Sequence, residues 1–487
     1  MNILRRGISP VVAVALLLVV AVVAVVMFSA WFDSFRSSLF TAAETKTSES
    51  QTVDIIDLVG EELFFQAGTN TSVSSVTVSN NECDFSSGVF SGLHVFDLTS
   101  CLDASGSSVE AVVVTDKGIY SKTFFVRESY SSRELLPVLL WNVTYDGGGL
   151  DAAYGIALGS SGNVYVTGRK YNGGNYDYLT FKYDTDGNEI WNVTYDGAFG
   201  HDYAYGIAVD SLENIYVTGY SRTATNYDYL TFKYDADGNE IWNVSYDTGN
   251  NDGALTVAVD TNENVYVNGK TSNGIDTDYT LVKYDSTGNE VWNVTYDGGN
   301  SDFGLGIDTD SLGNVYVTGN TYDGLTWQYL TMKYNSSGSQ IWNSSFEGGG
   351  VYDWGDNVVV DASGNVYVTG SSNNSVSYEY VTVKFDSNGN QIWNVTYDGG
   401  SDDHAQGMAL DTSGNVYVTG LTTNGGVSDY LTFKYDTNGN QIWNVTYNSG
   451  NDDGAQGIVV DTSGNVYVTG WTNNGTYNFL TFKYAQE

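Results

Sequence analysis

Short segments in which apolar and polar residues alternate recur along the chain from residue 141 onward. Alternation with a period of two residues is typical of β-strands that bury one face. In the first unit, between Trp141 and Asp184, the segments are WNVTYD, YGIALG, NVYVTG and YLTFKYD. Gly, Asn and Asp bound each segment, and connections such as SSGN and DTDGN are short enough for hairpins. The pattern predicts four antiparallel strands in each unit.

The unit recurs at a spacing of about fifty residues, which is typical of stacked or radial repeat folds. Its first residue falls seven times on a tryptophan: Trp141, Trp191, Trp242, Trp292, Trp342, Trp393 and Trp443. Four antiparallel strands make one propeller blade. The last unit stops after YNFLTFKY, whereas the first opens with an unpaired WNVTYD strand, so the N-terminal strand can complete the C-terminal blade and leave no free edge. We therefore expect an all-β, seven-bladed β-propeller over residues 138–487, closed by one N-terminal plus three C-terminal strands.

The repeats resemble a known family. The run HDYAYGIAVDSLENIYVTGYS (His201 to Ser221), followed by DYLTFKYD and WNVSYD, is similar to the SBBP type of β-propeller repeat, and the resemblance covers all seven units. It implies a propeller on a cell-surface or secreted protein, and it brings no defined catalytic motif. Gly159 departs from the pattern, because an aspartate stands there in the other six units: Asp210, Asp260, Asp310, Asp361, Asp411 and Asp461.

The N-terminal segment predicts a membrane anchor. An uncharged stretch from Ile8 to Phe32 is long enough for one bilayer-spanning helix, and Arg5 and Arg6 place its start inside. The string LRRGISPVVAVALLLVVAVV resembles the archaeal type IV pilin and archaellin leader. The resemblance implies a leader over residues 1–7, cleavage between Gly7 and Ile8, and a retained pilin-like helix over residues 8–45. A secretory signal removed near Ala30 is the alternative. With the anchor, the protein is single-pass and the bulk of the chain is extracellular.

A separate module precedes the repeats. Apolar alternation in five segments of residues 50–130 predicts a small β-sandwich, and residues 131–137 form a linker. Cys83 and Cys101 are the only cysteines in the chain. In an exported protein a disulfide between them is favoured over free thiols.

Charge excludes one class of partner and leaves another open. The chain has 58 Asp and Glu against 19 Lys and Arg, a net charge of −39, so phosphate backbones are repelled and nucleic acid is no partner. Turn motifs such as DTDGN use Asp to accept backbone N–H groups, although they also loosely resemble Asp-rich loops that bind Ca²⁺. We expect no cofactor unless it is Ca²⁺. A second set of aspartates enters the first strand of each blade, where turn capping and a cation site both remain open: Asp151, Asp202, Asp252, Asp302, Asp353, Asp403 and Asp453.

Deviations from the repeat mark a candidate binding face. One lysine per blade recurs on the third strand, and we expect it to pair with a carboxylate. The remaining basic residues of the repeats follow the VTG or VNG of the first three blades, and blades four and five place aromatic residues in loops of the same face. Exposed aromatic residues are typical anchors for sugars or proteins. The predicted ligand-binding residues are Arg169, Lys170, Arg222, Lys270, Tyr322, Trp327, Tyr352 and Trp354. Drift among similar repeats is the competing interpretation.

Seven Asn-X-Ser/Thr sequons recur in the tryptophan-bearing strand, where Asn and Thr share the strand face opposite Trp and Val. We expect them at the outer rim and available for glycosylation in an exported protein, although duplication of one ancestral sequon also explains them. They are Asn142, Asn192, Asn243, Asn293, Asn343, Asn394 and Asn444.

No catalytic constellation stands out: the chain has three histidines and no HExxH, GxSxG or glycine-rich phosphate motif after a suitable strand. The leading hypothesis is a membrane-anchored extracellular binding or adhesion protein that is not an enzyme. A minor pilin-like structural subunit, assembled with other pilin-like subunits, is the second hypothesis. A carbohydrate-active propeller enzyme is the third, because propellers host carboxylate-based glycosidases.

Overall fold

The computed structural model describes strands within residues 53–124 and the chain from residue 137 to 485, apart from residues 347, 349, 351 and 375. The chain divides into two compact units, one within residues 1–134 and one comprising Leu135–Glu487. The predicted leader and pilin-like helix, both cysteines and the linker up to residue 136 lie outside the described residues. In the described part of the chain, no helix is long and apolar enough to cross a membrane.

The first unit contains antiparallel strands in the segments that the alternation marked. One sheet holds them in the order β1-β2-β5-β6, with β3 and β4 also paired to the long strand β2. The strands are β1 (Val53–Val59), β2 (Glu62–Val78), β3 (Asn81–Glu82), β4 (Gly88–Asp97), β5 (Val109–Thr115) and β6 (Gly118–Phe124). The sandwich arrangement itself stays a prediction.

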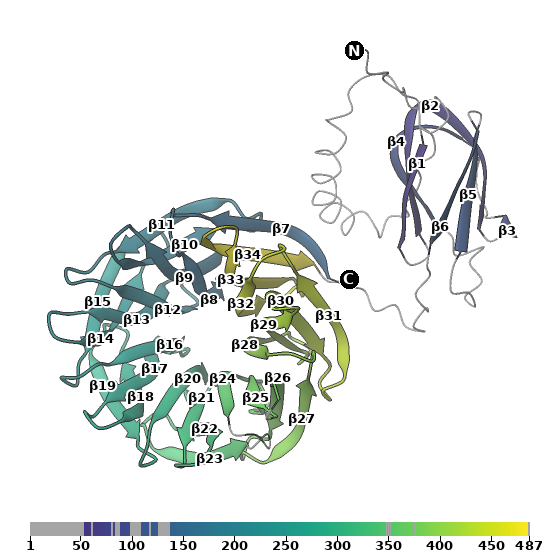
Figure 1. Cartoon of the computed structure of the whole chain (residues 1–487). Helices are drawn as coiled ribbons and strands as arrows, with labels where there is room; N and C mark the ends of the chain where they lie inside the picture. Colours follow the sequence, from purple (N-terminus) through teal and green to yellow (C-terminus); the bar gives the residue numbers. More distant parts are fainter. Residues whose placement is uncertain are drawn as a thin grey trace. The chain divides into compact units, whose positions relative to one another are not determined.

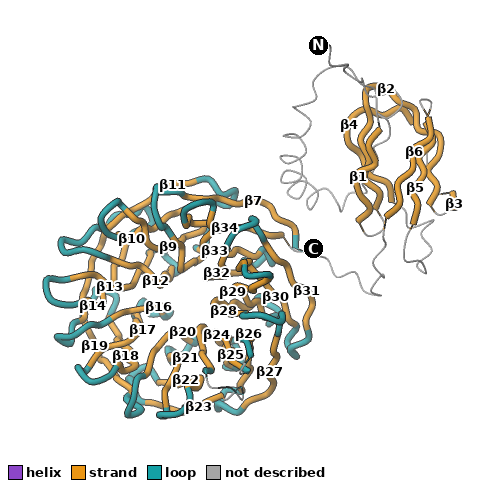
Figure 2. The backbone as a smooth tube through the Cα atoms, in the orientation of Figure 1, coloured by secondary structure: helices purple, strands orange, loops and turns teal. Residues whose placement is uncertain are grey.

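The second unit is a ring of seven four-stranded antiparallel sheets, so the predicted seven-bladed propeller is confirmed (Figures 1 and 2). The innermost strands are β8 (Ala152–Leu158), β12 (Asp202–Val209), β16 (Gly253–Val259), β20 (Asp302–Thr309), β24 (Asp353–Val360), β28 (Asp403–Leu410) and β32 (Asp453–Val460). The second strands are β9 (Val164–Tyr171), β13 (Ile215–Arg222), β17 (Val265–Ser272), β21 (Val315–Tyr322), β25 (Val366–Asn373), β29 (Val416–Asn424) and β33 (Val466–Asn473).

The third strands are β10 (Tyr176–Tyr183), β14 (Tyr227–Tyr234), β18 (Thr277–Tyr284), β22 (Trp327–Tyr334), β26 (Tyr378–Phe385), β30 (Val427–Tyr435) and β34 (Tyr477–Ala485). The outermost strands are β11 (Glu189–Tyr195), β15 (Glu240–Tyr246), β19 (Glu290–Tyr296), β23 (Gln340–Phe346), β27 (Gln391–Tyr397), β31 (Gln441–Tyr447) and β7 (Val138–Tyr145). Blades are numbered one to seven from the innermost strands β8 to β32.

The ring closes as the ends of the repeat array predicted. The seventh sheet has the order β32-β33-β34-β7, and β7 pairs with β34 in the register Leu480↔Thr144 and Phe482↔Asn142. An apolar cluster then joins Tyr467 and Phe479 of the seventh blade to Val164 and Phe181 of the first. The N-terminal strand thus forms the outer strand of the last blade, and apolar side chains pack the junction between the last blade and the first.

Apolar cores lie between neighbouring blades. Tyr165 and Tyr178 of the first blade, for example, pack with Ile215, Val217 and Phe232 of the second. The second strands supply residues that are fully buried on both faces, which is why their VYV segments read as continuous apolar runs. Each blade therefore depends on its neighbours for its core, as expected of a repeat fold.

A polar contact recurs at most of the blade junctions. The indole of Trp191 and the ammonium of Lys182 both donate to the carbonyl of Ala236 in the next blade, at 3.1 and 2.7 Å. The same pair crosses the closure, where Trp141 and Lys483 both donate to the carbonyl of Thr185 at 3.0 Å. Gly187 fits beneath this tryptophan, because its φ of 85° is left-handed and a Cβ there would lie 2.9 Å from the Trp141 ring.

The repeat lysines differ from the predicted carboxylate pairing. Each places Nζ 4.7 to 5.3 Å from the ring centroid of the tyrosine on the neighbouring second strand, so cation–π contact is what recurs. A carboxylate lies within 4 Å of two of them, as Lys233–Glu263 at 3.5 Å and Lys434–Asp411 at 3.8 Å. The lysines are Lys182, Lys233, Lys283, Lys333, Lys384, Lys434 and Lys483.

Candidate ligand-binding face

The two faces of the ring differ in their connections. One face, here called the turn face, carries the tight turns between first and second strands and between third and fourth strands. In these turns an aspartate such as Asp184 accepts N–H groups from Asp186 and Asn188, both at 2.9 Å, so its carboxylate is a turn cap. The other face, here called the loop face, carries the loops between second and third strands and the connections from each outer strand to the next blade. These vary between blades, so the loop face is the candidate site.

A hollow on the turn face offers little for recognition. It has a volume of about 390 Å³ and is lined mainly by aliphatic residues at the ends of innermost strands, such as Leu158, Val359 and Val460. Its carboxylate, Asp308, is held by the backbone N–H groups of Thr309 and Val360 at 2.8 Å. The acid thus links two blades instead of facing a ligand.

The seven aspartates that enter the innermost strands are buried caps of the loop face. Asp202 accepts from the N–H of Gly197 at 2.6 Å and from the hydroxyl of Ser221 at 2.5 Å, and it is fully buried. Burial raises the pKa of Asp202, while the hydrogen bonds from Ser221 and Gly197 act against that rise. All members of the set are buried in this way: Asp151, Asp202, Asp252, Asp302, Asp353, Asp403 and Asp453. Capping accounts for their repetition.

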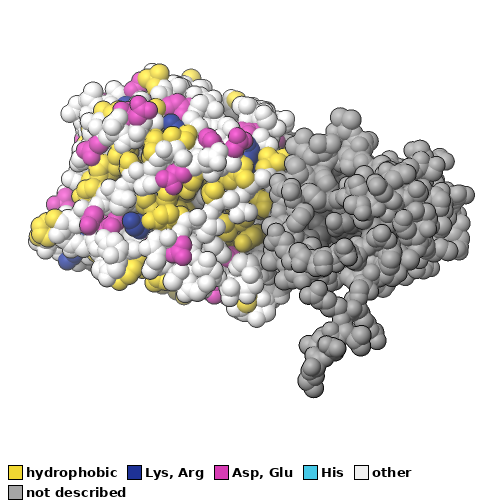
Figure 3. Space-filling model, turned by 90° about the horizontal axis from the view of Figure 1, so that it is seen from above, with side chains coloured by type: hydrophobic (Ala, Val, Ile, Leu, Met, Phe, Trp, Pro, Cys, Tyr) yellow, Lys and Arg dark blue, Asp and Glu magenta, His cyan; other side chains and the backbone are white. Residues whose placement is uncertain are grey.

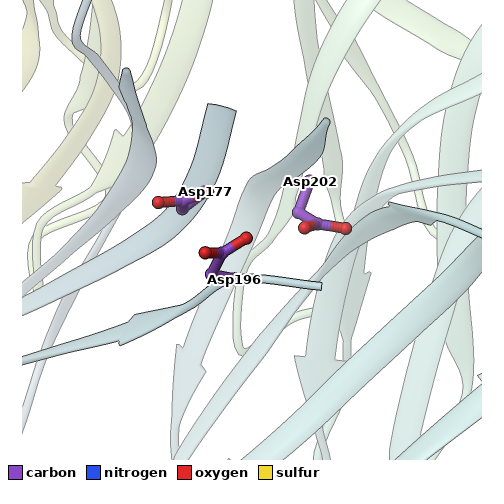
Figure 4. Close-up of side chains that lie close together, drawn as sticks. All are labelled: Asp177, Asp196 and Asp202. Atoms are coloured by element: carbon purple, nitrogen blue, oxygen red, sulfur yellow. The ribbon is translucent and has the colours of Figure 1, made fainter. Parts of the chain in front are cut away.

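Three of these caps have two further carboxylates beside them. Ligand oxygens lie within 4.8 Å of one another in each of three groups, the first of which is shown in Figure 4: Asp177, Asp196 and Asp202; Asp228, Asp247 and Asp252; Asp278, Asp297 and Asp302. Sequence reasoning found only the third member of each group. The first two members lie on different segments of the preceding blade. Among the described residues, these three groups are the ones that could hold a metal ion.

The predicted cations of the loop face are engaged with aromatic rings. The guanidinium of Arg169 lies 4.7 Å from the Tyr176 ring centroid, 5.6 Å from that of Tyr154 and 5.7 Å from that of Tyr203. Arg222 lies 5.1 Å from the Tyr227 centroid. Such contacts hold the cations against the faces of the rings, so a ligand would meet a mixed aromatic and cationic surface.

The other two cations differ from each other. Lys270 lies 5.3 Å from the ring of Phe303 in the next blade, and burial lowers its pKa. Lys170 faces Asp177 across the hairpin between β9 and β10. Lys170 is therefore the cation of this set that stands opposite a carboxylate.

The four predicted aromatic residues come together in one group. Trp327 lies 5.1 Å from Tyr322, and Tyr352 lies 6.4 Å from Trp354, measured between ring centroids. A backbone bridge between Trp327 and Tyr352 joins blades four and five. Tyr352 is 41% exposed, and the other three are half-buried.

Two residues that the sequence reasoning missed extend this group. Phe303 stacks on Trp327 at 5.4 Å with an interplanar angle of 22°, and Tyr378 lies 5.8 Å from Trp354. Tyr378 also lies 4.7 Å from the ring of His404 in the sixth blade. Phe303 follows a cap aspartate directly, as Trp354 does, and that position could have revealed it. We call Phe303, Tyr322, Trp327, Tyr352, Trp354 and Tyr378 the aromatic arc.

The sequons lie where the alternation placed them. In every outermost strand the sequon asparagine is exposed, while the preceding tryptophan is at least partly buried against the blades. Figure 3 shows the side of the ring, where acidic and apolar side chains intermingle and few basic ones appear. The asparagines of this rim are Asn142, Asn192, Asn243, Asn293, Asn343, Asn394 and Asn444.

Comparison with known proteins supports the repeat and the fold. The family described as SBBP, beta-propeller repeat, matches residues 195–227, 294–325, 346–376, 395–426 and 448–478. The chain is therefore a β-propeller repeat protein. No curated protein matches it significantly.

Similar solved structures share little sequence with this chain. Sqt1 from Chaetomium thermophilum is 11% identical with a TM-score of 0.44, covering 70% of this chain and 96% of its own. A gluconolactonase from Xanthomonas campestris is 14% identical with a TM-score of 0.35, covering 58% and 86%. A protein of unknown function from Dyadobacter fermentans is 10% identical with a TM-score of 0.40, covering 72% and 99%. At such values these likenesses say nothing about function.

Proposed function

We propose that this protein is a membrane-anchored extracellular binding or adhesion protein, not an enzyme, and that its propeller binds surface glycans with the loop face. The aromatic arc is the observation that carries the proposal. It gathers six aromatic residues from two blades on the face whose loops vary, and Tyr352 is 41% exposed. Flat aromatic faces beside polar groups suit the apolar ring faces of sugars.

Electrostatics narrow the class of ligand. A net charge of −39 disfavours strongly acidic polymers over most of the surface. Three basic residues of the loop face lie over aromatic rings and are therefore already engaged. Neutral sugars, or sugars with isolated acidic groups, thus fit this face best. Nucleic acid stays excluded on the same ground.

The membrane anchor rests on the sequence. The uncharged segment from Ile8 to Phe32 follows Arg5 and Arg6, and its leader resembles that of archaeal pilins. Processing is tested by the N-terminal residue of the membrane-bound protein. We expect Ile8; a mature chain that begins near Trp31 and is found in the medium would rule out the anchor.

The LRRGISPVV motif also favours a second candidate, a minor pilin-like subunit of a surface filament. The two functions make different demands on the propeller. An adhesin needs the aromatic arc for its activity, whereas a filament subunit needs the N-terminal helix in the filament. Purified filaments that contain the chain, together with binding that is indifferent to the arc, would favour the subunit.

The binding proposal is tested with the full chain in detergent on an array of neutral and acidic polysaccharides. Trp327→Ala and Trp354→Ala should each weaken the strongest binding by about 1 to 3 kcal/mol, because each removes a ring that a ligand covers. Leu312→Ala is the control, since Leu312 is 81% exposed on the turn face. Binding that survives both tryptophan substitutions but is lost with Leu312→Ala would move the site to the turn face. Absence of any polysaccharide binding would remove the glycan assignment.

A further inference from the structure

Three blade junctions of the loop face bring together carboxylates from three separate segments. In each, one aspartate is the second residue of a third strand, the next follows the outer strand of the same blade, and the last caps the innermost strand of the following blade. The first and last are buried and the middle one is exposed. Like charges this close, with two of them removed from water, repel strongly unless a counter-charge is present.

The junction between blades three and four is the most acidic. Asp278 and Asp302 are 5% and 0% exposed, and Asp297 lies beside them. Burial raises the pKa of both buried acids, followed by the charge of Asp297 and then by that of a fourth carboxylate, Asp276. The corresponding position in the first two blades is an amide, Asn175 or Asn226, so the extra charge is particular to this junction.

Buried oxygens at two of these junctions, those between blades two and three and between blades three and four, lack partners. Asp278 accepts a hydrogen bond from Asn273 at 2.9 Å through Oδ2, while its Oδ1 is buried and has none. Oδ1 of Asp228, at the junction of blades two and three, is likewise buried without a partner. A buried carboxylate oxygen without a donor costs free energy, and a cation removes that cost.

The junction between blades six and seven shows what happens when the third acid is absent. There Asn448 replaces the middle aspartate and donates to Oδ2 of Asp429 at 3.0 Å. Oδ1 of Asp429 is still unpaired, but only two carboxylates remain in this set. Asn448 also accepts from the N–H of Gly450 at 2.6 Å, as Asp297 accepts from Gly299 at 2.7 Å. The same turn therefore forms with either side chain, and the acids are not needed to fold it.

We propose that the groups Asp228–Asp247–Asp252 and Asp278–Asp297–Asp302 are Ca²⁺ sites that join successive blades, with the second the stronger. The group Asp177–Asp196–Asp202 is not among them, because both oxygens of Asp177 accept hydrogen bonds from Asn172 and Asn175 and Lys170 faces it. The chemistry fits a hard divalent cation bound by carboxylate oxygens and water. Ligand oxygens that lie within 4.8 Å of one another can share one divalent ion. Ca²⁺ accepts the irregular geometry of carboxylates from three segments, whereas Mg²⁺ demands near-ideal octahedral coordination. We expect a dissociation constant for Ca²⁺ of about 10⁻⁴ to 10⁻³ M, the range of extracellular Ca²⁺-binding modules.

The site goes beyond glycan binding and stands independently of it. Ca²⁺ would tie the third strand of one blade to the innermost strand of the next, so its effect is measured on stability. The experiment takes the full chain, stripped with a chelator, and follows its melting temperature with CaCl₂ up to about ten times the weakest expected dissociation constant. MgCl₂ at equal ionic strength serves as the comparison.

Two matched double variants distinguish Ca²⁺ binding at these groups from a general screening of negative charge by salt. Asp247→Asn with Asp297→Asn removes the exposed acid of two groups, whereas Asp146→Asn with Asp398→Asn removes two acids at the same repeat position outside them. Asp146 and Asp398 also accept N–H groups from Gly148 and Gly400, at 2.8 and 2.7 Å, so all four changes keep the turn.

We expect Ca²⁺ to raise the melting temperature of the wild type and of the Asp146/Asp398 variant equally. The Asp247/Asp297 variant should lose most of that rise, and its Ca²⁺ affinity should fall by about tenfold or more, because Ca²⁺ affinity follows the number of charged ligands. A wild type that is indifferent to Ca²⁺, an equal rise with Mg²⁺, or equal behaviour of the two variants would each overturn the proposal.

Discussion

The carboxylate of Glu213 in the second blade accepts a hydrogen bond from the hydroxyl of Tyr165 in the first, at 2.7 Å. In other blades the equivalent tyrosine donates to its own blade's turn aspartate, as Tyr216 does to Asp210 at 3.0 Å. The first blade has Gly159 there instead, and Glu213 also accepts from Ser161 N–H at 2.8 Å. The neighbouring blade thus supplies the carboxylate that the repeat has lost. It does so from a left-handed residue, since Glu213 has φ 65° where most repeats have glycine.

Replacement of Glu213 by glycine should destabilise the protein by about 1 to 2 kcal/mol. The loss of a charged partner for buried Tyr165 costs about 1.5 to 3 kcal/mol, and relief of the left-handed conformation returns part of it. Gly159→Asp alone should also be unfavourable, because a Cβ at Gly159 lies only 2.3 Å from the Glu213 carboxylate. The double variant should recover wild-type stability in chemical denaturation, since it restores the ordinary repeat.

Glu263→Gly is the control for this pair. Glu263 has a similar φ of 61°, but the preceding blade keeps its own Asp210, so this carboxylate replaces nothing. We expect a change in stability within about 0.5 kcal/mol, because the substitution removes a partly exposed ion pair with Lys233 at 3.5 Å. Two results would contradict the idea that Glu213 takes the place of the missing turn aspartate. One is an equal loss of stability in Glu213→Gly and Glu263→Gly, and the other is no recovery of stability when Gly159→Asp is combined with Glu213→Gly.

Closure of the ring makes β7 more sensitive than its equivalents. Val143 in β7 pairs with Thr481, and Val193 in β11 pairs with Thr180 at the same repeat position. Proline at either position distorts an outer strand by a similar amount. However, a turn joins β11 to its blade, whereas β7 is held to its blade by side chains and strand pairing alone. Val143→Pro should therefore lower the melting temperature more and promote aggregation, measured by light scattering. Equal effects would argue against the seam as the weakest junction.

Truncation of Arg169 should cost stability as well as any ligand binding. Its guanidinium lies among the rings of Tyr154, Tyr176 and Tyr203, so Arg169→Ala should destabilise by about 1 to 2 kcal/mol. Lys170→Ala, the neighbouring change of equal charge, should fall within about 0.5 kcal/mol. Denaturant unfolding of both variants measures the difference, and equal values would show that the tyrosines do not hold the arginine.

Asp228 should make the chelator-treated protein sensitive to pH. Burial, followed by the charges of Asp247 and Asp252, raises the pKa of Asp228 to about 6, above its ordinary value of 3.8. A raised carboxyl pKa favours folding at low pH, where the group is protonated in both states, and the benefit is lost as pH rises toward 6. Asp228→Asn should thus match the wild type near pH 4 and exceed its melting temperature by pH 7. Melting curves across this range test the sign; a difference that shrinks as pH rises would contradict it.

The sequence was enough to predict the propeller and its closure. Strand alternation, the spacing of Trp141 and its equivalents, and the offset between the first and last units are local or periodic features, and each has one geometric solution in a ring. The exposed sequon asparagines followed from the two-residue period of a strand. The loop face and four of its aromatic residues could be chosen for the same reason, since the repeat shows which connections vary.

Contacts between blades were decided by the tertiary structure alone. The partners in them belong to different repeats, and the similarity of the repeats makes many pairings equally compatible with the sequence. Within a blade, too, the lysines predicted to meet carboxylates lie over tyrosine rings, because the paired second strand places a tyrosine directly opposite each lysine. Glu213 reaches Tyr165, and Asp278 meets Asp302, only because adjacent blades pack at one fixed register. The sequence determines what each blade carries, and the packing of blades determines which of those groups meet.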